Sequence, residues 1–360
     1  MRLIHVADLH LESAMESNLS SDKARLRREE LLDRFSDLVC YGEEHQVDAI
    51  LIAGDLFDKT HIRKAARSRV LEEIREHTNI TFFYLQGNHD RSDFLQDVHL
   101  EEIPNLKLFD ANQWSSYELG DVVITGREIT AENAKTFTMN LVLDSANCNI
   151  VMLHGQESEY QGKDKTEIIP LGDLRGKYID YLALGHIHSY KKERLDDRGE
   201  YCYPGCLEGR GFDECGEKGF VLLEILEGKV ESQFIPFAKR RLHEVEVELT
   251  EEDDMPSVLG KIKEKVESIS EEDFIKIVLT GNTHVDFDVD LSRILREFGE
   301  KYFFVKVYDH STIKVHYEDF INDKSLKGEF VRLMEQQEMD EMKKSLIVEI
   351  GMKALMGEEL

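Results

Sequence analysis

Several features that would assign this chain to a familiar class of protein are scarce in its sequence. Its 360 residues include one tryptophan, and no apolar run approaches the roughly 18 residues needed to span a membrane. The five cysteines, an odd number, provide no disulfide framework: Cys40, Cys148, Cys202, Cys206 and Cys215. Cys202, Cys206 and Cys215 also lack the paired spacing of a zinc site, so we interpret all five as reduced, mostly buried thiols.

Basic residues are also in deficit. Forty-five lysines and arginines stand against 73 aspartates and glutamates, a formal net charge of −28. Residues 241–360 alone hold 16 basic and 29 acidic side chains. This balance is opposite to the basic footprint of most DNA-binding proteins. One basic cluster, Arg63, Lys64, Arg67 and Arg69, is equally well interpreted as a solvated helix face or as a surface that follows a phosphate backbone.

Five short polar segments each follow an apolar run that predicts a buried strand. The runs cover residues 3–6, 49–53, 80–85, 150–153 and 181–184. The segments are Asp8-Leu9-His10, Gly54-Asp55-Leu56-Phe57-Asp58, Gly87-Asn88-His89-Asp90, His154-Gly155 and Gly185-His186-Ile187-His188. Open α/β folds place their sites where strands end, so we expect these side chains to converge on one rim of a sheet.

The chain exceeds the length that a single core usually supports, so we expect more than one domain. Apolar strands alternate with helical patterns at 25–45 and 63–77, and residues 219–236 predict two strands joined by a turn. Beyond residue 237 we predict strands at 243–249, 274–279 and 303–308 and helices at 256–269 and 291–301. The chain is then helical from residue 324. The apolar stripe from Leu326 to Ile350 and its methionines fit either a partner's surface or the chain's own domains.

The polar segments supply the donors that two divalent metal ions require. Hydrolysis of a phosphate ester needs an activated water and neutralised charge, which a metal pair about 3.5–4 Å apart provides. Any one donor has a simpler explanation, such as a histidine at a strand end. Glycines beside most of the segments favour the whole set as a site. Its mixed nitrogen and oxygen donors suit Mn²⁺, Fe or Zn²⁺: Asp8, His10, Asp55, Asn88, His154, His186 and His188.

The ordered set resembles the calcineurin-like metallophosphoesterase superfamily. The resemblance implies an α/β fold: an αββα sandwich at 1–240, a small α/β capping domain at 241–320 and a helical partner-binding segment at 321–360. It implies that Asp8, His10 and His188 hold one metal ion, most simply Mn²⁺, and that Asn88, His154 and His186 hold a second. Asp55 would bridge the two ions. His89 would act on the leaving oxygen, and Asp90 would orient His89.

Further segments resemble the branch of SbcD-type DNA-repair nucleases, YhaO-like exonucleases in particular. They are residues 4–13, 53–58, 203–206, 209–214 and 216–220. Asp58 stands where archaeal and eukaryotic members have a histidine, and Cys206 stands where a serine is common. The resemblance implies a cytoplasmic metal-dependent DNA exonuclease subunit that binds an SMC-like coiled-coil ATPase through its C-terminal helices, with no membrane contact. The sequence does not decide whether the chain forms a homodimer. Two alternative functions also stay open: a small-molecule phosphodiesterase or phosphatase, and a non-catalytic scaffold.

Overall fold

The computed structural model describes residues 1–15, 19–58, 62–87, 94–158 and 167–356. It divides the chain into two compact units, Met1–Arg241 and Leu242–Leu360. The C-terminal helices belong to the second unit. Within the described ranges, no helix is both long enough and apolar enough to cross a membrane.

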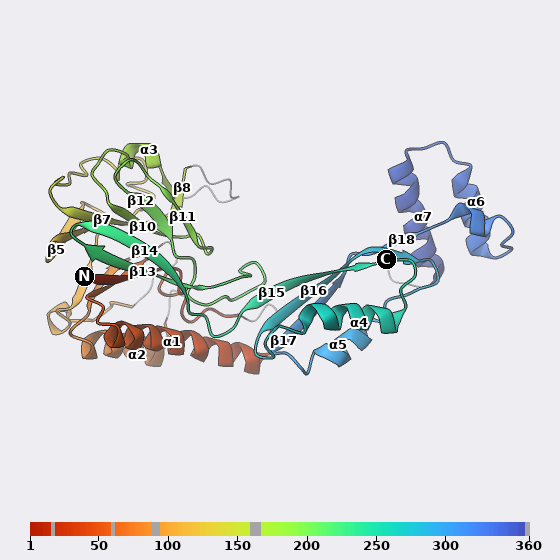
Figure 1. Cartoon of the computed structure of the whole chain (residues 1–360), viewed down its shortest axis with the longest axis horizontal. Helices are drawn as coiled ribbons and strands as arrows, with labels where there is room; N and C mark the ends of the chain where they lie inside the picture. Colours follow the sequence, from red (N-terminus) through yellow and green to blue (C-terminus); the bar gives the residue numbers. More distant parts are fainter. Residues whose placement is uncertain (16–18, 59–61, 88–93, 159–166, 357–360) are drawn as a thin grey trace. The chain divides into compact units, whose positions relative to one another are not determined.

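Two six-stranded sheets form the frame of the first unit (Figure 1). In the first sheet the order is β14-β13-β1-β2-β3-β4. Strands β1 to β4 are parallel to one another, β13 is antiparallel to β1, and β14 is antiparallel to β13. Its strands are β1 (Arg2–Val6), β2 (Ala49–Ala53), β3 (Thr81–Leu85), β4 (Leu106–Leu108), β13 (Gly219–Leu226) and β14 (Lys229–Pro236). The buried apolar runs predicted from the sequence are therefore strands, and β1, β2 and β3 all end at the same edge.

The second sheet has the order β11-β12-β10-β7-β6-β5, and its central strands are parallel. Its strands are β5 (Ser115–Leu119), β6 (Val122–Gly126), β7 (Cys148–His154), β10 (Tyr181–Gly185), β11 (Lys191–Arg194) and β12 (Glu200–Tyr203). The sheets pack face to face, because Leu51 and Phe83 of the first share one buried cluster with Ile150 and Tyr181 of the second. Strands β7 and β10 end next to each other, so His154 and His186 leave the sheet side by side.

Helices cover the outer face of the first sheet. Helix α1 (Ser21–Glu44) is capped by Ser20, whose side chain accepts a hydrogen bond from the backbone N–H of Lys23, and α2 (Lys64–Glu76) follows β2. Phe35 and Val70 of these helices pack with Ile52 of β2. The outer face of the second sheet carries the short helix α3 (Leu171–Leu174) and irregular chain around Phe137. The predicted sandwich is confirmed, although one of its outer layers is mostly irregular.

Three smaller elements complete the first unit. They are the 3₁₀ turn η1 (Leu100–Glu102) and a two-stranded sheet of β8 (Gln156–Glu157) and β9 (Ile168–Ile169). This small sheet follows His154 directly and so borders the edge at which the polar segments lie.

The second unit is a parallel sheet with two helices on one face (Figure 1). Its elements are β15 (Leu242–Leu249), α4 (Met255–Val266), β16 (Phe274–His284), α5 (Leu291–Phe298), β17 (Phe304–Asp309), β18 (Thr312–Lys314), η2 (Tyr317–Phe320), α6 (Leu326–Glu335) and α7 (Glu341–Met356). Helices α6 and α7 bury Val331, Val348 and Met352 with Ile313 of β18. The C-terminal chain is thus two helices, broken before Asp340, which accepts a hydrogen bond from the N–H of Lys343 at 3.1 Å.

Candidate metal centre

The turns after β1 and β2 are held together by backbone hydrogen bonds. The N–H of Asp8 donates to the carbonyl of Gly54 at 3.1 Å, and that of His10 to the carbonyl of Asp55 at 2.9 Å. Asp8, His10 and Asp55 all have positive φ, at 53°, 44° and 54°. A non-glycine residue in this region costs about 1–3 kcal/mol, so the surrounding contacts must stabilise it. Here the strained backbone turns three potential ligands toward one place.

Close packing brings the ends of the two sheets together at this place. Gly54, at φ 91°, lies so close to His154 that a Cβ atom would stand 2.2 Å from its Nδ1. At Gly87 a Cβ would stand 2.2 Å from Oδ1 of Asp55. Any larger residue at either position would displace His154 or Asp55. The glycines beside the polar segments therefore make room for the side chains that the segments supply.

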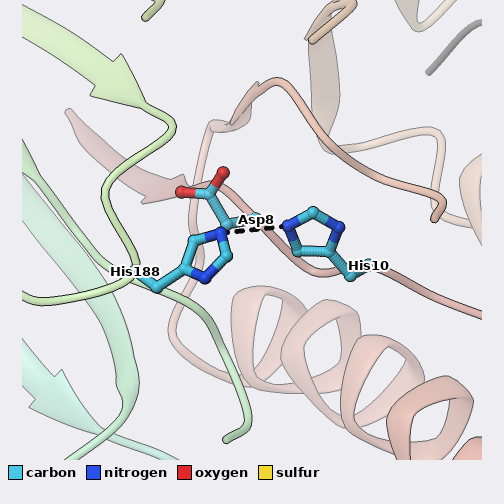
Figure 2. Close-up of side chains that lie close together, drawn as sticks. All are labelled: Asp8, His10 and His188. Atoms are coloured by element: carbon cyan, nitrogen blue, oxygen red, sulfur yellow. Dashed lines mark hydrogen bonds between the residues drawn. The ribbon is translucent and has the colours of Figure 1, made fainter. Parts of the chain in front are cut away.

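Asp8, His10 and His188 form the first cluster (Figure 2). The Nε2 atoms of His10 and His188 are 3.1 Å apart, and both carboxylate oxygens of Asp8 accept the backbone N–H of His186 at 3.0 Å. Asp8 and His10 are buried. Two nitrogens at this separation can bind one ion, because nitrogen ligands about 2.0–2.1 Å from a tetrahedral metal lie roughly 3.3 Å apart.

Carboxylates fix the orientation of both histidine rings. Nδ1 of His10 is 3.2 Å from Oδ1 of Asp58, and Nδ1 of His188 is 2.8 Å from Oε1 of Glu214. An ionised carboxylate only accepts, so each Nδ1 carries the hydrogen and each neutral ring keeps its lone pair on Nε2. The two lone pairs then face each other and repel, unless a proton or a metal ion lies between them. This donor arrangement fits a metal ion.

Asp55 lies between the first cluster and a second one. Its Oδ2 is 3.7 Å from Nε2 of His10 and 3.4 Å from Nε2 of His154. The His154 ring is fixed by the carbonyl of Ala53, 2.9 Å from Nδ1, and it meets the His186 ring edge to face at 5.4 Å. One carboxylate group within reach of histidines from both clusters is the arrangement that a bridging ligand requires.

The electrostatics of the centre favour a cation. Burial lowers the pKa of His154, but Asp55 and Asp8 outweigh burial and raise this pKa to about 10. Burial likewise lowers the pKa of His188, and the bond to Glu214 outweighs it, so the pKa rises. At His10 burial dominates and the pKa falls. The buried carboxylates thus attract positive charge, and a bound metal ion would take the place of the proton on His154.

Three supporting residues had no role assigned from the sequence. Arg210 donates from Nη2 to Oε1 of Glu214 at 2.7 Å, and its Nη1 is 3.9 Å from Oδ1 of Asp58. It therefore links the two carboxylates that orient His10 and His188. Burial raises the pKa of Glu214, but His188 and Arg210 outweigh it and hold this pKa well below its usual range. Asp58, which stands where archaeal and eukaryotic members have a histidine, contacts Nδ1 of His10. It therefore orients a proposed ligand without itself binding the metal ion.

The other departure, Cys206, is fully buried beside the same residues. Its Sγ is 3.6 Å from the carbonyl of His188 and 3.7 Å from Oε2 of Glu214. Burial raises the pKa of this thiol well above its usual value, so it stays protonated and can act as a weak donor.

The remaining predicted site residues divide into two groups. Asn88, His89 and Asp90 lie outside the described residues. The basic cluster lies at the start of α2. There Arg63 forms a two-fold ion pair with buried Glu12, at 2.7 and 2.6 Å, while Arg67 donates to the carbonyl of Phe94 at 2.8 Å. Arg69 contacts Ser36 and Asp33, at 3.0 and 2.9 Å, and Lys64 is exposed. The three arginines of the basic cluster therefore all bind groups of this same chain.

Several known proteins are similar to this chain. Residues 1–190 match the family model described as calcineurin-like phosphoesterase. The uncharacterized metallophosphoesterase YhaO of Bacillus subtilis is 26% identical over 304 residues, 78% of this chain and 72% of that protein. The DNA double-strand break repair protein Mre11 of Sulfolobus acidocaldarius is 24% identical over 337 residues, 89% of this chain and 85% of that protein. The crystal structure of TT1561 of Thermus thermophilus aligns with a TM-score of 0.43 and 14% identity, over 65% of this chain and 98% of that one.

Proposed function

The chain belongs to the calcineurin-like phosphoesterase family, whose members hydrolyse phosphoesters at a dinuclear metal site, and on this basis we propose that it is a DNA nuclease. The observation that carries the hydrolytic part is the position of Asp55 between two groups of buried histidines. DNA as the substrate is supported by the relative named as a DNA repair protein, which aligns with 89% of this chain and so with both of its units.

In the proposed mechanism each residue binds a metal ion, orients another side chain or moves a proton. Asp8, His10 and His188 would hold one ion, His154 and His186 the other together with Asn88, and Asp55 would bind both. When bound, the two ions would supply an activated water and positive charge to neutralise the phosphate. Asp58 and Glu214 keep the rings of His10 and His188 in the ligating orientation. His89 would protonate or stabilise the leaving oxygen, and Asp90 would orient His89.

We propose Mn²⁺ as the working ion because imidazole and carboxylate donors are mixed at this site. Fe and Zn²⁺ fit the same donor types. Metal analysis of the protein purified without added metal, followed by activity measurements with each ion, tests this choice.

The second candidate function is hydrolysis of small phosphodiesters, and the net charge of −28 favours it. A strongly acidic protein repels the backbone of DNA, which supplies most non-specific affinity. The deciding experiment compares single-stranded DNA, duplex ends and bis-p-nitrophenyl phosphate with Mn²⁺ after EDTA treatment. Cleavage of the small ester alone would reject the nuclease. No hydrolysis of any of them would favour a scaffold.

We also propose that the C-terminal helices bind an SMC-like coiled-coil ATPase. Val331 and Val348 are buried in the second unit, while Leu326, Leu333, Leu346 and Ile350 of the same helices are between 43% and 67% exposed. Apolar side chains left exposed on neighbouring helices are typical of a protein interaction site. A partner with basic residues would supply the DNA affinity that this acidic chain lacks.

A further inference from the structure

A carboxylate with no role in the mechanism above lies in the second cluster. A ligand atom of Glu167 and one from each of His154 and His186 all lie within 4.8 Å of one another. The sequence did not indicate this, because Glu167 follows none of the strands that carry the polar segments. From this position we propose that Glu167 is a ligand of the second metal ion and favours Mn²⁺ there. The inference rests on the two-metal centre and not on DNA as the substrate.

The backbone around Glu167 is built to bring it close to His154. A Cβ atom on Gly155, at φ 152°, would stand 2.2 Å from the carbonyl oxygen of Glu167. That carbonyl accepts the N–H of Gln156 at 3.1 Å, and the pairing of β8 with β9 continues directly from it. Glu167 itself has a positive φ of 55°. The two segments can approach this closely for two reasons. Gly155, after His154, has no side chain, and the backbone of Glu167 adopts a strained conformation.

The donors of the two clusters become balanced when Glu167 is included. The first cluster combines two imidazoles with the carboxylates of Asp8 and Asp55. Among the described residues the second cluster has two imidazoles, from His154 and His186, and without Glu167 its carboxylates are those near the first cluster as well, Asp55 and Asp8. Carboxylate oxygens suit Mn²⁺ and Mg²⁺, whereas imidazole suits Zn²⁺. A carboxylate that belongs to this cluster alone therefore raises the affinity of this position for Mn²⁺ more than its affinity for Zn²⁺.

Metal titration of the full chain tests the proposal without reference to hydrolysis. Metal-free protein is titrated with Mn²⁺ and with Zn²⁺ by calorimetry, and bound Mn²⁺ is examined by electron paramagnetic resonance. The wild type should bind two Mn²⁺ ions that couple magnetically. In Glu167→Gln the second Mn²⁺ should bind at least about 10–100-fold more weakly, the range found when residues that only support a ligand are replaced. The coupling should be lost, and Zn²⁺ affinity should fall less.

Two further variants make the result decisive. Glu118→Gln removes the same charge from an exposed position on β5 and should bind both ions as the wild type does. Glu167→Asp keeps the carboxylate on a shorter side chain and should bind the second Mn²⁺ with intermediate affinity. Thermal unfolding of the metal-free proteins checks the fold. Wild-type affinity for two Mn²⁺ ions in Glu167→Gln would overturn the proposal, even if hydrolysis fell. Glu167-dependent binding without DNA cleavage would instead reject only the nuclease.

Discussion

At the scale of single residues, Asp55 connects the two halves of the metal centre. Its Oδ2 is within 3.7 Å of both His10 and His154, and its backbone is fixed in a strained turn. Asp8 also lies near histidines of both clusters, but its two carboxylate oxygens accept the backbone N–H of His186. Removing the Asp55 carboxylate therefore affects both ions at once, whereas the loss of any one histidine would affect one ion.

Asp55→Ala should abolish magnetic coupling of bound Mn²⁺ and lower phosphodiester hydrolysis by at least about 10³-fold. The physical reason is that neither ion keeps its shared ligand. Hydrolysis of bis-p-nitrophenyl phosphate and metal titration measure the two effects. Asp121→Ala, at an exposed turn position, is the matched control. Full activity of Asp55→Ala in EDTA-treated buffer would contradict the two-metal mechanism.

His89 has a different proposed role, in which it contacts the substrate and not the metal. His89→Ala should keep both Mn²⁺ ions and lower turnover by about 10²–10⁴-fold, the scale for a positioned general acid. His99→Ala, an exposed histidine later in the chain, should change neither quantity. If His89→Ala fails to bind one of the ions, His89 is a ligand or a structural residue.

At the scale of secondary-structure elements, the sequence predicted most of the fold because buried parallel strands are nearly continuous apolar runs. The run at 3–6 is β1 and the run at 49–53 is β2. Strand β16 extends beyond its predicted end because β18 pairs with Asn282–His284, a contact between separate parts of the chain. Glu167, Arg210 and Glu214 were missed for the same reason, since only the folded chain brings them to the histidines.

A buried ionic network fixes α1 to the segments before Arg241. Arg27 donates to Glu30 at 2.7 Å and to Glu208 at 3.0 Å, and Arg240 also binds Glu30. Burial raises the pKa of Glu30, but Arg240, Arg27 and Lys239 outweigh it and lower this pKa to about 2. The folded pKa is below the unfolded one, so this group stabilises the fold above about pH 4.3 and loses that effect as the pH falls through about 2.

Arg27→Met should destabilise the first unit by about 3–5 kcal/mol at pH 7, because it removes the guanidinium that pairs with buried Glu208 and one of the cations that pair with Glu30. The only tryptophan, Trp114, lies in this unit, so its fluorescence during urea unfolding reports on this unit alone. Arg25→Met, on the exposed side of the same helix, is the control. An unchanged urea midpoint for Arg27→Met would show that the network does not stabilise the fold.

Helix α2 provides a separate test of DNA binding. If its first two turns follow a phosphate backbone, Lys64→Gln and Arg69→Gln should each reduce the slope of log affinity against log salt by about 0.9. Arg75→Gln, in the last turn of the same helix, should leave the slope unchanged. Arg63 is unsuitable for this test because its loss would leave buried Glu12 without its ion pair. Equal slopes in all variants would identify the cluster as a solvated helix face.

At the scale of the whole molecule, the net charge and the exposed apolar surface both lead us to expect a protein partner. Because the chain has 73 acidic against 45 basic residues, we expect it to bind DNA weakly on its own at physiological salt. One part of the apolar stripe of α6 and α7 packs within the second unit and another part is exposed, so binding of a partner there stays a prediction. Truncating the chain before α6 would expose Ile313 and Phe320, so point substitutions are the cleaner test.

Leu333→Glu together with Leu346→Glu should abolish binding to the SMC-like ATPase, because each replaces an apolar side chain that is 55% exposed with a charged one. Hydrolysis of bis-p-nitrophenyl phosphate should stay at the wild-type rate, since the metal centre lies in the first unit. Leu226→Glu makes the same change at a 76% exposed leucine at the end of β13 and should leave binding intact. Co-purification and calorimetry measure the interaction. Unchanged binding in the double variant would exclude this surface, and lost binding with an altered circular dichroism spectrum would instead indicate that these leucines support the fold.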